Sequence, residues 1–199
     1  MKIDWTELHR TDVEFARKVL LGQGEVIPMF IVHAGTKTLA VVSQWRDDDE
    51  KRQAFLLVAL LAAREGAEAI GFISEAWIRQ VDHAPRETEA EFAARVKAVA
   101  PSEAEDRQEV VMCAMQYRDP VAGKRSLMTS LDIVRDATGK PVAAPKRTDD
   151  GYDRLGGAAL ALLSERLPDA HARARAGQIY AKALEILGLV ESQHAIVLH

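Results

Sequence analysis

Three acidic side chains on predicted strands are the first candidates for chemistry in this sequence. Glu75 lies within one predicted strand, Glu109 begins the next, and Asp132 lies in the strand after that. Carboxylates on neighbouring strands can converge on a divalent cation, and Mg²⁺ and Mn²⁺ favour such oxygen ligands. In this interpretation the chain is a metal-dependent hydrolase or nuclease. In the alternative, the three carboxylates point into solvent from the open face of an antiparallel sheet, and no cofactor is required.

Two tryptophans indicate a second kind of site, which would bind a ligand or a partner without catalysis. Trp77 follows Glu75 by two residues, so both side chains share one face of the strand. The next residue on that face is Arg79, and Trp45 ends an earlier predicted strand. Tryptophan and arginine dominate the energetics of protein interfaces, so these four residues form the candidate binding site. The alternative is that both tryptophans pack under helices.

Other common signatures of catalysis are absent from the sequence. No Walker sequence occurs, and the Gly22-Gln23-Gly24 run follows a predicted helix, whereas a dinucleotide loop follows a strand. Neither the two-histidine zinc motif nor a Gly-x-Ser-x-Gly elbow occurs. The one cysteine, Cys113, lies within an apolar strand and is expected to be buried. The sequence therefore favours a non-catalytic interaction or regulatory module that can bind a ligand, with the hydrolase as the alternative.

Composition narrows the class of protein further. The chain has 199 residues, 48% of them hydrophobic and 28% charged, which is typical of one globular domain. A single cysteine excludes a disulfide-built fold. The net charge of −4 provides no basic excess, so nucleic acid is not an expected partner. Residues 1–10 lack the apolar stretch of a signal peptide, and no run reaches the roughly 20 apolar residues of a membrane span. We expect a cytoplasmic protein with no membrane partner.

Hydrophobic periodicity predicts an α+β fold. We expect a mostly antiparallel sheet of five or six strands, with helices on one face and a C-terminal helical pair. The predicted strands are 26–32, 38–44, 69–79, 109–118, 125–135 and 141–144. The predicted helices are 11–21, 47–65, 88–99, 152–167 and 169–187.

Local signals refine several of these elements. Thr11 with Glu14, and Thr88 with Glu91, have the spacing of a capping box at a helix start. Pro28 cannot donate a ladder hydrogen bond, which predicts that the first strand lies at an edge of the sheet. The segment between the third and fourth strands is charged and contains prolines, so it is predicted to be an excursion that carries a short helix.

Apolar surface predicts self-association. Residues 1–145 are expected to form the α+β domain, and residues 146–199 a C-terminal helical appendage of it. The predicted helix around 54–63 is apolar on nearly all sides, and the C-terminal pair offers more apolar surface than a lone helical hairpin can bury. A homodimer is therefore expected, and a different protein partner is also possible.

Two short runs carry a resemblance to other proteins. These runs are Glu75-Ala76-Trp77 and Asp106-Arg107-x-Glu109-Val110-Val111. In them the chain resembles a loose set of uncharacterised bacterial and phage-associated proteins, in which an acid-Ala-Trp strand precedes an Arg-x-Glu-Val strand. The resemblance covers residues 26–134 and leaves out the C-terminal helices. It implies no known activity and assigns no catalytic residue.

Overall fold

The fold is given by a computed structural model that describes residues 3–78, 84–99, 103–147, 162–163, 167–189 and 196–198. Its helices are α1 (Trp5–Gln23), α2 (Asp48–Glu65), α3 (Glu89–Ala98) and α4 (Ala170–Leu187). Its strands are β1 (Met29–Ala34), β2 (Lys37–Ser43), β3 (Ala69–Ile78), β4 (Gln108–Asp119), β5 (Gly123–Asp132), β6 (Val134–Arg135), β7 (Pro141–Ala143) and β8 (Ile196–Leu198). The α+β class predicted from the sequence is confirmed.

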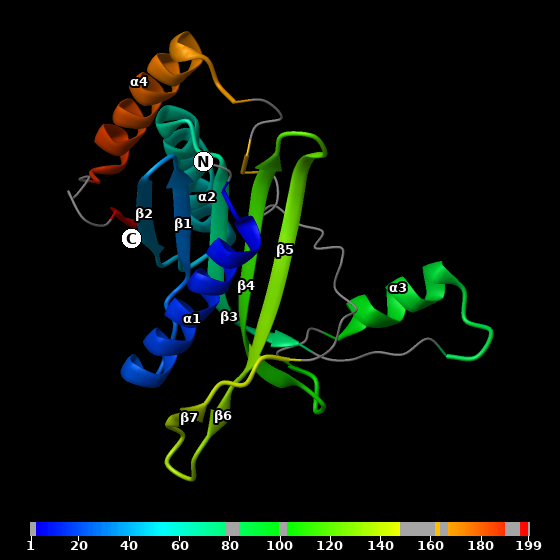
Figure 1. The fold of residues 1–199 in the computed structure, drawn as a ribbon. Coiled ribbons are helices and arrows are strands. Elements are labelled where there is room, and N and C mark those ends of the chain that lie inside the picture. Colours follow the sequence, from blue (N-terminus) through cyan, green and yellow to red (C-terminus); the bar gives the residue numbers. More distant parts are fainter. Residues whose placement is uncertain are drawn as a thin grey trace.

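Five antiparallel strands form the main sheet, in the order β5-β4-β3-β1-β2, and β8 adds to β2 in parallel (Figure 1). Strands β6 and β7 form a separate small hairpin. The predicted edge position of the first strand is wrong, because β1 lies between β2 and β3. Pro28 precedes the strand, so its missing N–H removes no hydrogen bond from β1. Its carbonyl accepts a hydrogen bond from the Ser43 N–H at 2.9 Å.

Helices cover both faces of the sheet, whereas the sequence predicted helices on one face. Helix α1 crosses one face, and α2 lies against the other with α4 beside it (Figure 1). The strands require cover on both sides because their residues are apolar on both sides. Phe30 and Phe72 pack against α2, and Ile31 and Ile73 pack against α1.

The helix starts show which capping signals are used. Helix α1 begins earlier than predicted, because the Asp4 carboxylate accepts the backbone N–H groups of Thr6 and Glu7, each at 3.1 Å. The predicted capping box at Thr11 is wrong: the residue lies inside α1, where its hydroxyl donates to the Glu7 carbonyl at 3.1 Å. Helix α2 begins at its predicted Asp47 cap.

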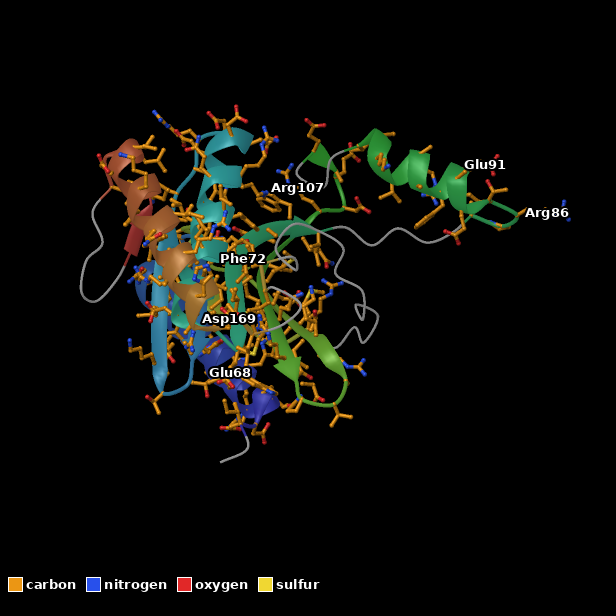
Figure 2. The ribbon with its side chains drawn as sticks, turned by 90° about the horizontal axis from the view of Figure 1, so that it is seen from above. Glu68, Phe72, Arg86, Glu91, Arg107 and Asp169 are labelled. Atoms are coloured by element: carbon orange, nitrogen blue, oxygen red, sulfur yellow. The ribbon has the colours of Figure 1, made fainter. Side chains whose placement is uncertain are left out.

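Helix α3 lies between β3 and β4 in the sequence and projects away from the sheet in space (Figure 1). The capping box predicted at Thr88 and Glu91 is formed, and no residue of α3 is buried. Seen from above, Phe72 lies in the body of the molecule, while Arg86 and Glu91 lie at the far end of this arm (Figure 2). The predicted excursion is therefore an arm that makes no contribution to the core.

The C-terminal helix α4 packs back onto α2. Tyr180 and Leu184 of α4 are buried in the same core cluster as the apolar side chains of α2. The Arg64 guanidinium carbon lies 4.7 Å from the centre of the Tyr180 ring. The other predicted C-terminal helix, 152–167, falls almost entirely outside the described residues. Among the helices that the structure describes, none is long and apolar enough to cross a membrane.

Candidate functional site

Two of the three candidate metal-binding carboxylates lie together, with a guanidinium between them. Arg135 donates two hydrogen bonds to Glu109, at 2.7 and 2.6 Å, and its Nη2 lies 3.8 Å from Oε2 of Glu75. Its Nη1 donates to the carbonyls of Gly24, at 3.3 Å, and Gly139, at 3.1 Å. The chain thus supplies its own cation to this pair of acids, and the same side chain joins four segments of the fold.

Glu75 is held by the backbone as well as by charge. Its Oε1 accepts the Val26 N–H at 2.7 Å. Burial raises the pKa of Glu75, the Val26 hydrogen bond lowers it, the charge of Glu109 raises it and the charge of Arg135 lowers it. The carboxylate is therefore harder to ionise than a free one, and the hydrogen bond from Val26 fixes its position beside the segment that joins α1 to β1.

Asp132 lies on the other face of the sheet. It is opposite Val110 in the register, and Val110 alternates with Glu109 along β4. Arg147 pairs with Asp132 at 3.3 Å and also donates to Gln108. Within the described part of the chain, no group of three histidine, cysteine or acidic side chains could hold a metal ion. The three candidate carboxylates do not converge.

Trp77 lies at the end of β3, next to the segment that leads to the arm. Its side chain is 42% exposed, and the Arg107 guanidinium carbon lies 4.9 Å from the ring centre. Figure 2 shows Arg107 on the side of the body from which α3 projects. The other candidate on this face, Arg79, lies outside the described residues. Trp77 is therefore a surface residue stacked with a cation.

Trp45 lies on the opposite face of the sheet from Trp77. Its half-buried ring packs against Phe55, at 6.1 Å between ring centres, and is stacked with Phe72 at 6.4 Å. Trp77 shares the face of Glu109, its partner in the register, which is the face turned to Arg135 and Gly24. The two tryptophans thus lie on opposite faces of the sheet, and they cannot form one binding site as the sequence suggested.

A cleft of about 640 Å³ opens beside Trp45. Its described walls come from the end of β2, the start of α2 and the residue before β1: Pro28, Gln44, Trp45, Arg46 and Glu50. The volume lies within the roughly 300–1,000 Å³ that ligand pockets usually have. Of the four predicted binding residues, Trp45 is the one that lines a described cavity.

The polar wall of the cleft is an ion pair. The Glu50 carboxylate accepts the backbone N–H of Arg46 at 2.7 Å and its Nε at 2.8 Å, with a further contact to Nη2. The hydrogen bonds from the Arg46 side chain and backbone lower the pKa of Glu50, so this carboxylate is ionised at neutral pH. A second cation, Lys51 Nζ, lies over the Trp45 ring at 5.7 Å from its centre.

A smaller pocket of about 60 Å³ adjoins the cleft. It shares Gln44 and Glu50 with the cleft and continues between α2 and the end of α4, where Leu187 lines it. Ser43 is also among its lining residues, and the Ser43 hydroxyl is fully buried and has no hydrogen-bond partner among the described residues. Buried hydroxyls ordinarily have a partner, so the Ser43 hydroxyl is an exception in the described part of the chain.

A hydrogen-bonded chain that runs from the buried Asp12 and His33 to the exposed Thr38 was missed from the sequence. The His33 imidazole lies 3.1 Å from Asp12 Oδ2 and 3.2 Å from the Thr38 hydroxyl. The Asp12 carboxylate also lies 3.0 Å from where a Cβ on Gly71 would be, so a side chain there would collide with it. The order of hydroxyl, imidazole and carboxylate is that of an activated nucleophile. We assign the chain a structural role, because it satisfies polar groups buried between α1 and the sheet.

The same interface holds two further ionisable groups. The buried His9 Nε2 lies 3.1 Å from the Thr129 hydroxyl, and burial lowers the pKa of this histidine. Cys113 is 1% exposed, and burial raises the pKa of its thiol to about 12, with a contribution from the charge of Asp12. It is a packing residue, as the sequence predicted, and not a nucleophile.

Comparison with known proteins adds no further assignment. The chain matches no protein-family model, no curated protein and no solved structure. The resemblance at residues 75–77 and 106–111 therefore stays a prediction.

Proposed function

We propose that this chain is a non-catalytic ligand-binding module whose ligand occupies the Trp45 cleft. The observation that carries the proposal is the cavity of about 640 Å³ lined by Trp45 and by the Arg46–Glu50 ion pair. Ligand sites combine apolar and aromatic walls with a few placed polar groups, and this cleft has both. The other tryptophan of the predicted binding site, Trp77, lines no described cavity, so it serves as the internal comparison.

The cleft is better suited to binding than to chemistry. Its ionisable groups, Arg46 and Glu50, neutralise each other, and its other described walls are an indole, a proline ring and an amide. None of these pairs a nucleophile with a base, as covalent catalysis requires. The geometry does not favour the hydrolase alternative, because Arg135 lies between Glu75 and Glu109, and Asp132 is on the other face.

Self-association is a second part of the proposal. Leu56 of α2 and Ile179 and Ile186 of α4 are 60%, 46% and 73% exposed, so both helices present apolar side chains to solvent. A homodimer would bury such side chains. The molar mass measured by light scattering is expected to be twice that of the chain and to fall to that of one chain in Ile186→Glu. A wild-type chain that is monomeric at all concentrations rules out this part. The cytoplasmic location expected from the sequence belongs to the same proposal.

The ligand-binding proposal is tested by a fragment screen with a site-specific readout. A molecule that binds the folded state raises the melting temperature, and the three tryptophan indole N–H signals in a ¹H–¹⁵N spectrum report where it binds. Single Trp→Phe variants assign those signals to Trp5, Trp45 and Trp77. We expect fragments that raise the melting temperature to move the Trp45 signal and leave the Trp77 signal in place. A screen in which no fragment moves the Trp45 signal would refute the proposal.

A further inference from the structure

We infer that the ligand of the Trp45 cleft is a small organic cation, an inference that rests on the ligand-binding function proposed above. Both charge-accepting surfaces at this end of α2 already carry a cation from the chain itself. Lys51 Nζ lies over the indole of Trp45, and the Arg46 guanidinium lies on the carboxylate of Glu50. These side chains show which kind of charge each surface accepts.

The indole is positioned to receive a positive charge. Its ring is fixed from the core side by Phe55 and Phe72, at 6.1 and 6.4 Å between ring centres. Lys51 Nζ, 5.7 Å from the ring centre, is within the roughly 6 Å over which an aromatic face attracts a cation. Lys51 is exposed and is not among the described residues that line the cleft. Its ammonium is strongly hydrated, so a ligand that reaches the indole can displace it at little cost.

The carboxylate is fixed while its cation is free to leave. The Glu50 side chain is 18% exposed and is anchored by the Arg46 backbone N–H at 2.7 Å, whereas the Arg46 side chain is 88% exposed. An ion pair at such an exposed position contributes little to stability. A ligand cation in the cleft can therefore replace the guanidinium on Glu50 without moving the backbone.

An anionic ligand fits the same walls less well. To reach Arg46 it would have to share the guanidinium with Glu50, which lines the same cleft, so the two negative charges would repel each other. A cationic ligand would instead replace one positive charge on Glu50 with another. Residues 46–52 contain four acidic and three basic side chains, and the whole chain has a net charge of −4, so the surrounding field also favours a cation.

The test compares three probes of one shape and three charges. Tetramethylammonium, tert-butanol and pivalate all present a compact branched head, and they are positive, neutral and negative. Each is titrated into the full chain while the Trp45 indole N–H signal is followed. We expect tetramethylammonium to bind about tenfold more tightly than tert-butanol, as a cation on an aromatic face beside a carboxylate should, and pivalate to bind most weakly.

Two variants separate the parts of the inference. Lys51→Ala uncovers the indole and is expected to strengthen tetramethylammonium binding about threefold. Glu50→Gln keeps the shape but removes the charge and is expected to weaken the binding about fivefold. Lys18→Ala changes an exposed lysine on α1, and it should have no effect on the affinity.

The possible results are distinguishable. Equal affinity for the three probes, or no change in Lys51→Ala and Glu50→Gln, overturns the cation inference while the Trp45 cleft stays a binding site. If pivalate binds best, the ligand class is an anion and the inference is wrong. If no probe or fragment moves the Trp45 signal, the proposed function fails together with the inference.

Discussion

Replacing Arg135 with methionine tests how much the contacts of its guanidinium contribute to the stability of the fold. Methionine keeps most of the aliphatic length but removes every hydrogen bond of the guanidinium. In the wild type these bonds run to Glu109, to the carbonyl of Gly24 after α1 and to the carbonyl of Gly139 between β6 and β7, with Glu75 3.8 Å away. The variant leaves two carboxylates close together with no cation between them.

The expected loss of stability is about 2–3 kcal/mol. Breaking a buried ion pair by removing one partner costs roughly 3–5 kcal/mol, because the other charge is left uncompensated. Here the side chains of Arg135 and Glu109 are 28% and 21% exposed, so water screens part of that cost. The expected loss is therefore below the range for a fully buried pair. A double variant, Arg135→Met with Glu109→Gln, should recover part of the loss because it removes the unpaired charge.

The assay is urea unfolding at neutral pH and again at about pH 5. The charge of Arg135 lowers the pKa of Glu75, so its removal raises that already elevated pKa further. A folded state whose carboxyl has a raised pKa binds protons more readily than the unfolded state, so stability is gained as the pH falls through the folded pKa. The penalty of Arg135→Met should therefore be larger at neutral pH than at about pH 5. A penalty below about 0.5 kcal/mol, or one that is the same at both pH values, would refute this account of the cluster.

Four further outcomes follow from the structure. Trp77→Ala should change the unfolding free energy by less than about 1 kcal/mol, since the ring is 42% exposed, and a larger loss in urea unfolding would show that it is core. Burial lowers the pKa of His9, so stability should fall as the pH drops below the ordinary value of 6.5, and His9→Gln should reduce that fall in parallel melts. Cys113 should react with a thiol reagent only after unfolding, because burial raises its pKa to about 12, and rapid labelling of the native protein would contradict this. Mn²⁺ should leave the melting temperature unchanged, because the position between Glu75 and Glu109 is taken by Arg135.

Secondary structure was the part most accessible from the sequence. Alternating apolar residues identified the strands, and the Asp47 and Thr88 caps identified two helix starts that the structure confirms. Helix α1 shows the limit of such signals. Asp4 and Thr11 both begin plausible helices, and the earlier cap is used because the buried face of α1 extends back from Val13, Ala16 and Leu20 to the polar residues Asp12 and His9.

The site was less accessible, because it depends on which side chains meet across the sheet. Glu75 and Glu109 share a face through the pairing of β3 with β4, and Asp132 falls on the other face because it is opposite Val110. A shift of one residue in either register would have reversed that arrangement. The role of Arg135 depends on where the small β6–β7 hairpin lies against the main sheet, and no local pattern encodes that position.

The exposed position of helix α3 has a consequence for local unfolding of the protein in solution. It has ten residues, none of them buried, and is supported by its own capping box and by the Arg95–Glu87 ion pair. Isolated helices shorter than about 12–15 residues are marginal in water, so we expect α3 to form and melt in a local equilibrium that the body does not share. Its amide hydrogens should exchange with solvent far faster than those of β3 and β4 beside it. A molecule that orders this arm would slow the exchange there and leave the global unfolding transition where it was.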